Sequence, residues 1–189
     1  MPNPIRLTPP RRGLHAARPL LAAAALASLT ACGGNDSNKF APPCPVPSIP
    51  RDLGDLHRYR GAGRDITDSV LEGRITGLEG SCTRDSTDTT VATISVGIEL
   101  ARGPAAPSRV ADVAYFVAVS EGDTILDKRV YTLRAEFPSN TDRLRLAGDQ
   151  VELRLPVTAT KTAAAYRVSI GFQLTPAEVE LNRQRGPRR

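Results

Sequence analysis

The chain between residues 69 and 172 is a succession of short runs in which apolar and polar residues alternate. In the clearest run, residues 92–100, every second residue is apolar: Ala92, Ile94, Val96, Ile98 and Leu100. A two-residue period is that of a β-strand with one buried and one solvated face. The alternation therefore predicts a mostly β protein in which most strands have one solvent-exposed face.

Similar runs, separated by turn-forming residues, predict strands over residues 69–78, 113–119, 125–137, 144–146, 151–155 and 164–172. Turns are expected at 121–123 (Glu-Gly-Asp) and 147–149 (Ala-Gly-Asp). About six or seven short antiparallel strands favour a mostly β, two-sheet sandwich of immunoglobulin-like or fibronectin-like type. A small closed barrel is the alternative.

One of these runs is irregular. In residues 125–137 the odd positions carry Ile125, Tyr131, Leu133 and Phe137, but Asp127 and Arg129 interrupt the same face. The chain then ends with a helix signal, Thr175-Pro176-Ala177-Glu178, in which Thr caps, Pro suits the first turn and Glu completes a capping box. A short C-terminal helix from residue 176 to about 184 is predicted, with Val179 and Leu181 towards the sandwich.

The N-terminus carries a different kind of signal. Residues 1–18 are polar and basic, and residues 19–31 (PLLAAAALASLTA) are almost wholly apolar. Thirteen residues are too few for a bilayer core that needs about 20 helical residues. The order of a basic segment, an apolar run and small residues is typical of a secretory signal peptide.

The end of this signal, Leu29-Thr30-Ala31-Cys32, resembles the lipobox of bacterial lipoprotein precursors. The resemblance implies that Leu29, Thr30 and Ala31 form the signal-peptidase recognition site, and that the Cys32 thiol receives lipid, including palmitate-type acyl chains. Several acyl chains together anchor a protein firmly in a lipid bilayer. Gly33, where Asp often retains lipoproteins in the inner membrane, favours the outer membrane facing the periplasm.

We therefore expect residues 1–31 to be removed, 32–50 to form a flexible Gly/Pro-rich tether, 51–182 to form the sandwich domain and 183–189 to be a basic disordered tail. With Cys32 lipidated, Cys44 and Cys82 remain, and an even remainder in an exported protein predicts one disulfide. A catalytic thiol is the alternative reading, but no CxxC spacing supports it.

The positive net charge of +5 comes from the two ends of the chain. Residues 1–31 hold four arginines and no acid, and the tail holds Arg183, Arg185, Arg188 and Arg189. The remaining residues 32–182 carry −3, so the domain has no electrostatic footprint for nucleic acid. The four tail arginines are candidates for contact with an anionic envelope polymer.

No catalytic or metal site can be assembled from the sequence. His57 is the one histidine left after signal removal, which excludes a multi-histidine zinc site. A hydrolase relay through His57 would need Ser69, Ser81 or Ser95, and no GxSxG motif is present. We therefore expect His57 to be a surface histidine or one whose ring is satisfied by hydrogen bonds.

Two other patterns have a structural explanation. Asp65, Asp68, Asp85 and Asp88 could offer calcium ligands, but they lack EF-hand spacing and suit turns. The segment 61–65 (GAGRD) falls short of a nucleotide-binding glycine motif and is expected to be a loop. No cofactor or metal is therefore expected.

The mature chain also resembles small proteobacterial lipoproteins that carry no known activity. The likeness rests on residues 102–105 (RGPA), 115–119 (YFVAV), 171–176 (GFQLTP) and 182–183 (NR). These observations together predict a membrane-anchored, non-catalytic lipoprotein that acts as a structural or protein-interaction module for an unidentified envelope protein. A carrier or sensor of a small apolar ligand is the second hypothesis, and an enzyme of unfamiliar type is the third.

Overall fold

The computed structural model describes residues 43–186, in which nine strands, one α-helix and two short 3-10 helices (Ile66–Asp68 and Ala163–Ala165) are found. The strands are β1 (Pro47–Ser48), β2 (Asp55–Tyr59), β3 (Ser69–Arg84), β4 (Thr89–Arg102), β5 (Val110–Glu121), β6 (Thr124–Glu136), β7 (Arg143–Ala147), β8 (Val151–Pro156) and β9 (Arg167–Phe172), and the helix is α1 (Pro176–Arg185). The lipobox residues Leu29, Thr30, Ala31 and Cys32 lie outside the described residues.

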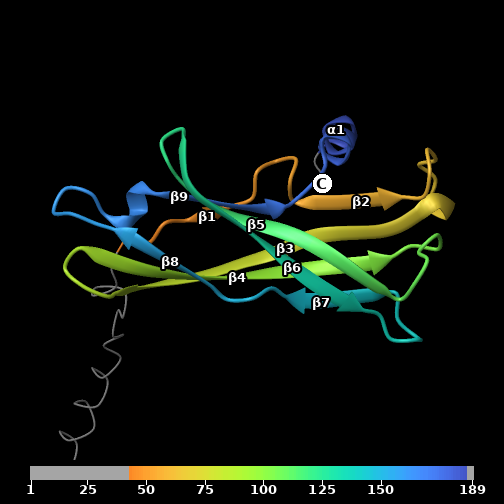
Figure 1. Cartoon of the computed structure of the whole chain (residues 1–189), viewed down its shortest axis with the longest axis horizontal. Helices are drawn as coiled ribbons and strands as arrows, with labels where there is room; N and C mark the ends of the chain where they lie inside the picture. The colour runs from red at the N-terminus through yellow and green to blue at the C-terminus, as the bar shows by residue number, and fades with distance from the viewer. Residues whose placement is uncertain (1–42, 187–189) are drawn as a thin grey trace, which may run out of the picture. The chain divides into compact units, whose positions relative to one another are not determined.

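The strands form two sheets that face each other across the core (Figure 1). The first sheet has the order β1-β9-β5-β6. In the second sheet the order is β2-β3-β4, and β7 and β8 share the far edge of β4. All pairs are antiparallel except β1 with β9. No strand pair joins the two sheets in residues 43–186, so the sandwich prediction is confirmed and the closed barrel is not what forms.

The connections resemble those of immunoglobulin-like sandwiches. The chain crosses between sheets after β1, after β4, after β6 and after β8, so that β4 pairs with β7 and β8 while β5 pairs with β9. In the immunoglobulin fold the second strand pairs with the fifth, and the third strand pairs with the sixth. The β4–β8 pair corresponds to the first of these pairings, and the β5–β9 pair corresponds to the second. The last strand of an immunoglobulin sandwich has no counterpart here, and the N-terminal β1 takes its place beside β9.

The core is built from the alternating faces that the sequence displays. Ile94, Val96, Ile98 and Leu100 of β4 are each at most 2% exposed. They belong to one cluster with buried residues of the opposite sheet: Val113, Tyr115, Val117, Val168, Ile170 and Phe172. Burying aliphatic side chains on both inner faces is the main stabilising term in such a sandwich.

The predicted turn at residues 147–149 does not reverse the chain, so that expectation is wrong. β7 and β8 both run antiparallel to β4, as two halves of one edge with an irregular stretch between them. Gly148 explains the irregularity, because a Cβ there would lie 2.5 Å from the Tyr115 hydroxyl. Its amide still donates to the Val96 carbonyl at 2.8 Å, which keeps the edge attached. The other predicted turn, at residues 121–123, is present between β5 and β6, with Gly122 at φ 54°.

The boundary predicted between tether and domain needs correction. The sequence predicts that residues 43–50 belong to the tether, but β1 lies among them and pairs with β9. The Cys44–Cys82 disulfide is formed, with Cα atoms 5.6 Å apart. Since Cys82 lies in β3, the bond joins the segment entering the first sheet to the second sheet. Residues 32–42 lie outside the described residues.

The C-terminal helix begins at the predicted residue, and its capping box is present: Thr175 and Glu178 bond each other's backbone amides. Its docking residue is Asn182, which is 8% exposed and donates to the carbonyls of Asp52 and Asp55. Val179 and Leu181, expected to face the sandwich, are only partly buried. The predicted disordered tail is wrong for residues 183–185, which continue the helix.

One hydrogen bond closes the connection between β8 and β9. The Tyr166 hydroxyl donates to the Pro156 carbonyl at 2.7 Å, and the Tyr166 side chain is buried. Immunoglobulin-like domains place a tyrosine at the corresponding corner, bonded to backbone a few residues upstream. The contact holds the end of β8 against the start of β9, where the chain changes sheet.

Replacing Tyr166 by Phe should lower the free energy of unfolding by about 1 kcal/mol, because the Pro156 carbonyl loses its protein donor. Chemical denaturation measures this difference. Tyr115→Phe is the matched control and should cause no loss, since the buried Tyr115 hydroxyl has no hydrogen bond of normal geometry in the described structure. Equal losses for the two variants would contradict the assignment of the corner bond.

Candidate functional site

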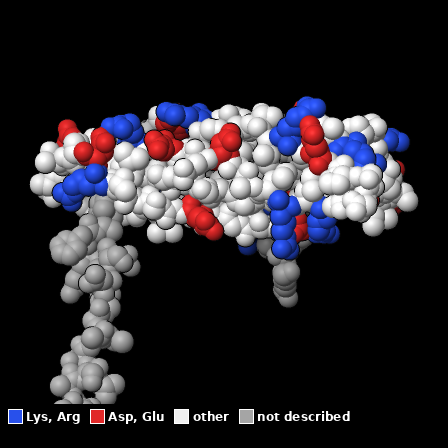
Figure 2. Space-filling model, turned by 90° about the horizontal axis from the view of Figure 1, so that it is seen from below, with Lys and Arg blue, Asp and Glu red and all other residues white. Residues whose placement is uncertain are grey.

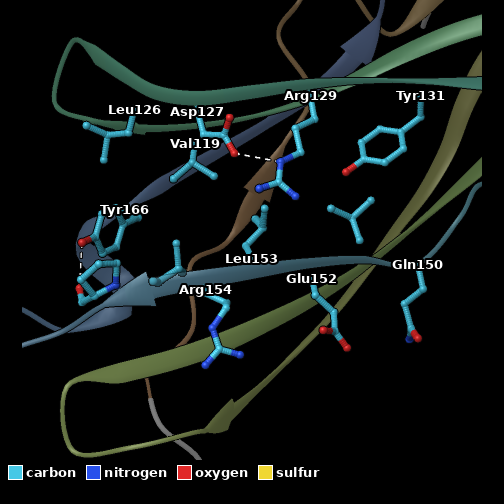
Figure 3. A pocket seen from close by; sticks show the side chains of 13 residues that line it. Val119, Leu126, Asp127, Arg129, Tyr131, Gln150, Glu152, Leu153, Arg154 and Tyr166 are labelled. Carbon is cyan, nitrogen blue, oxygen red and sulfur yellow. Dashed lines mark hydrogen bonds and ion pairs between the residues drawn. The ribbon is translucent and has the colours of Figure 1, made fainter.

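A groove of about 720 Å³ opens between β6 and β8, at the free edges of the two sheets (Figure 3). Ligand-binding clefts in proteins are typically of roughly 300–1,000 Å³. The side chains that line it come mainly from these two strands: Leu126, Asp127, Arg129, Tyr131, Val151, Glu152, Leu153, Arg154, Leu155 and Pro156, with Val119, Gln150 and Tyr166.

The groove exists because β6 and β8 each have one edge without a neighbouring strand. β6 pairs only with β5, and β8 only with β4, in the part of the chain that the structure describes. The first seven residues of β6, 124–130, are all exposed. An unpaired edge presents a row of backbone amides and carbonyls to any extended chain that approaches it.

The floor of the groove is apolar. Val151, Leu153 and Leu155 project inward from β8 and are at most 6% exposed. Val119 of β5 and the ring of Tyr166 complete the floor, both also buried. An apolar occupant would therefore displace water from hydrophobic surface, which is favourable.

The rim is charged, and most of its charges are paired. On β6, Arg129 Nε donates to Asp127 at 3.0 Å along the strand (Figure 3). Glu152 of β8 has no ion pair among the described residues. On β8, Arg154 pairs with Asp85 of the β3–β4 turn. Asp127 and Arg129 are the two residues that interrupt the apolar face of this strand in the sequence. Their position explains the interruption, because the sandwich is open at that point and has no core for them to face.

At one end of the groove, the lining residue Tyr131 stacks on Tyr115 with ring centroids 5.4 Å apart. Burial raises the pKa of the Tyr115 hydroxyl, and the nearby Asp149 carboxylate raises it further, while the backbone amide of Asp149 opposes the shift. Tyr115 thus stays neutral at physiological pH and supports the Tyr131 ring from the core.

The structure places His57 as a buried structural residue. It is 4% exposed, and its Nδ1 lies 3.3 Å from the Arg185 guanidinium and 3.9 Å from Glu72. Of the serines considered as partners, Ser69 and Ser81 lie at opposite ends of β3 and Ser95 lies in β4. Of the two readings offered for His57, a surface or a hydrogen-bonded histidine, the surface reading is wrong, because the side chain is buried and has polar neighbours.

The four aspartates considered for calcium fall into two distant pairs. Asp65 and Asp68 precede β3, whereas Asp85 and Asp88 follow it. Sixteen strand residues separate the pairs by roughly 50 Å, so they do not form one site. Asp88 accepts the Ser86 hydroxyl, which lowers the pKa of that carboxyl. Within residues 43–186 no group of three or more His, Cys, Asp or Glu side chains could hold a metal ion.

Two of the arginines predicted to contact an anionic polymer make contacts inside the domain. Arg183 donates to Asp52 at 3.3 Å, and Arg185 reaches His57 and the Tyr59 hydroxyl. These contacts hold the end of α1 against β2. Arg188 and Arg189 lie outside the described residues.

Comparison of the chain with protein-family models, with characterised proteins and with solved structures finds no match. The groove between β6 and β8 is therefore the feature on which a functional argument must rest.

The floor and the rim of the groove should respond differently to truncation. Leu153→Ala should lower the free energy of unfolding by about 3 kcal/mol, because it removes a side chain that is 6% exposed. Leu126→Ala, at a side chain that is 52% exposed, should cost less than about 0.5 kcal/mol. Denaturant unfolding compares the two, and a large loss for Leu126→Ala would mean that this residue belongs to the core.

Proposed function

We propose that the protein is a lipid-anchored, non-catalytic interaction module of the bacterial cell envelope, and that its interaction surface is the open side of the sandwich between β6 and β8. The observation that carries the proposal is the apolar groove lying between two unpaired strand edges. Edges of this kind bind extended segments by adding a strand, with main-chain hydrogen bonds giving affinity and the floor giving specificity.

The chemistry of the groove supports binding without catalysis. Its lining residues include no serine, cysteine or histidine. Cys44 and Cys82 are held in their disulfide, so neither thiol is available as a nucleophile. At the rim, Asp127 pairs with Arg129 and Arg154 pairs with Asp85, which leaves Glu152 as the lining charge without an ion pair among the described residues.

The surface charge also fits a partner that is not strongly charged. On the face seen in Figure 2, acidic and basic side chains are interspersed and do not form a field of one sign. Nucleic-acid partners require a concentrated basic patch, so we exclude them from the proposal.

The anchor is part of the proposal and rests on the resemblance of residues 29–32 to a lipobox. No helix within residues 43–186 has the length and apolarity needed to cross a membrane. An acylated Cys32 would place the domain beside the bilayer, attached through the segment that the Cys44–Cys82 disulfide holds at the entry to the sheets.

Photo-cross-linking in cells tests the proposed surface. A photoreactive amino acid at Leu126, on the groove side of β6, should give a discrete cross-linked product, because this side chain lines the groove and is half exposed. Immunoblotting and mass spectrometry identify the product. Arg134, an exposed position on the same strand outside the groove lining, is the matched control. Absence of a product at Leu126, or equal products at both positions, would overturn the proposal.

Cys32→Ser tests the anchor. The wild-type chain should incorporate labelled palmitate and sediment with membranes, whereas the variant should do neither, because the hydroxyl is not the thiol that receives the lipid. Gly33→Asp is the control: it should remain lipidated and shift towards the inner membrane. Membrane retention and labelling of Cys32→Ser would show that residue 32 is not the site of acylation.

A second candidate function is carriage of a small apolar ligand, which the volume and apolar floor of the same groove favour. Native mass spectrometry of the protein from envelopes should then show a bound mass of constant size, lost in Leu153→Arg. Bare protein alone would dismiss this candidate.

A further inference from the structure

The seven exposed residues at the start of β6 are unusually apolar for a free edge. Ile125 is 65% exposed, Leu126 is 52% and Val130 is 53%. They account for three of the seven exposed large hydrophobic side chains found in residues 43–186. Long exposed edges with apolar side chains are sites of strand pairing with another chain.

We propose that the partner on this edge is a second copy of the same chain, with the two β6 strands pairing antiparallel about a two-fold axis at Lys128. This inference rests on the proposed function, because it names the partner of the same open side. The first sheet would continue from one subunit into the other, with the order β1-β9-β5-β6 followed by its symmetry mate.

The register follows from charge complementarity. Pairing about Lys128 puts Asp127 opposite Arg129 of the second copy, and Arg129 opposite its Asp127. Opposite charges directly across a strand pair are stabilising. The β-bulge at Leu126 ends the regular alternation of β6, so the residue pairs next to the axis set the register.

Neighbouring registers are disfavoured on the same grounds. An axis at Asp127 would put the two Asp127 carboxylates opposite each other, and an axis at Arg129 would do the same for the two guanidinium groups. Like charges directly opposite destabilise a strand pair. The axis at Lys128 is the one register in which both groove-side charges meet an opposite charge within β6.

Charged residues on an edge strand often prevent pairing with another chain. The partners of Asp127, Lys128 and Arg129 therefore decide whether this edge can pair. Asp127 and Arg129 already pair with each other at 3.0 Å, so they present no net charge to an incoming strand. Lys128 falls opposite its own symmetry mate, which is unfavourable. Its ammonium, however, lies 4.6 Å from the Phe116 ring centroid of its own subunit, and this contact turns the charge back onto the outer face of the sheet.

The charges at positions 127 and 129 allow a test by charge exchange. The full-length, lipidated protein in detergent should be a dimer by analytical ultracentrifugation. Asp127→Arg and Arg129→Asp should each raise the dimer dissociation constant by roughly tenfold, because each puts like charges opposite in both symmetric pairs. The double exchange, Asp127→Arg with Arg129→Asp, should restore the wild-type constant.

A cysteine on the axis tests the geometry independently. Lys128→Cys should form a disulfide-linked dimer on mild oxidation, because residues directly opposite have Cβ atoms about 4.5–5.5 Å apart. Thr132→Cys, on the same face but away from the axis, is the matched control and should not cross-link. Efficient cross-linking of Thr132→Cys, or none of Lys128→Cys, would contradict the register and overturn the inference.

The inference and the proposed function fail in different ways. A monomeric wild-type protein whose Leu126 cross-links in cells to a different protein would overturn the second copy as partner and leave the interaction surface in place. A monomer without any cross-link at Leu126 would overturn both. A dimer unaffected by the single charge reversals would also reject the pairing proposed here.

Discussion

The second sheet depends on β4. This 14-residue strand pairs with β3 along one edge and with β7 and β8 along the other, and its inward residues alternate without interruption. A shift of one residue would turn Ile94, Val96, Ile98 and Leu100 from the core to the solvent. The cost of exposing these side chains sets the register of the strands on both sides of β4, and thereby where β8 ends and the groove floor lies.

The groove follows from how the two sheets end. One sheet stops at β6 and the other at β7 and β8, and no strand in residues 43–186 bridges them. Tyr166 closes the corner at one end of β8, and Gly148 lets the edge bend around Tyr115 at the other. Both contacts hold β8 while its free edge stays accessible, so the surface we assign to binding is rigidly supported but unpaired.

The candidate site was visible in the sequence only as an irregularity. Asp127 and Arg129 break an apolar face, and local pattern alone cannot tell whether such a break marks a strand end, a buried ion pair or an opening in the core. β8 was predicted as a strand, yet its role as a groove wall depends on pairing with β4, some 60 residues earlier in the chain. The turn predicted at residues 147–149 was wrong because local sequence does not show what a glycine contacts in the fold. A glycine is equally compatible with a chain reversal and with the close approach of the backbone to another side chain.

The sequence by itself determined the strand class of the domain, most strand positions, the capped C-terminal helix and the cysteine pair. These features depend on two-residue alternation, local backbone chemistry and the count of thiols, all of which are read over a few residues. The tertiary structure alone decided the sheet order, the parallel pairing of β1 with β9, the burial of Asn182 and His57, and the opening between β6 and β8. Each of these depends on contacts between segments far apart in the chain, whose energies only exist once the two sheets have come together.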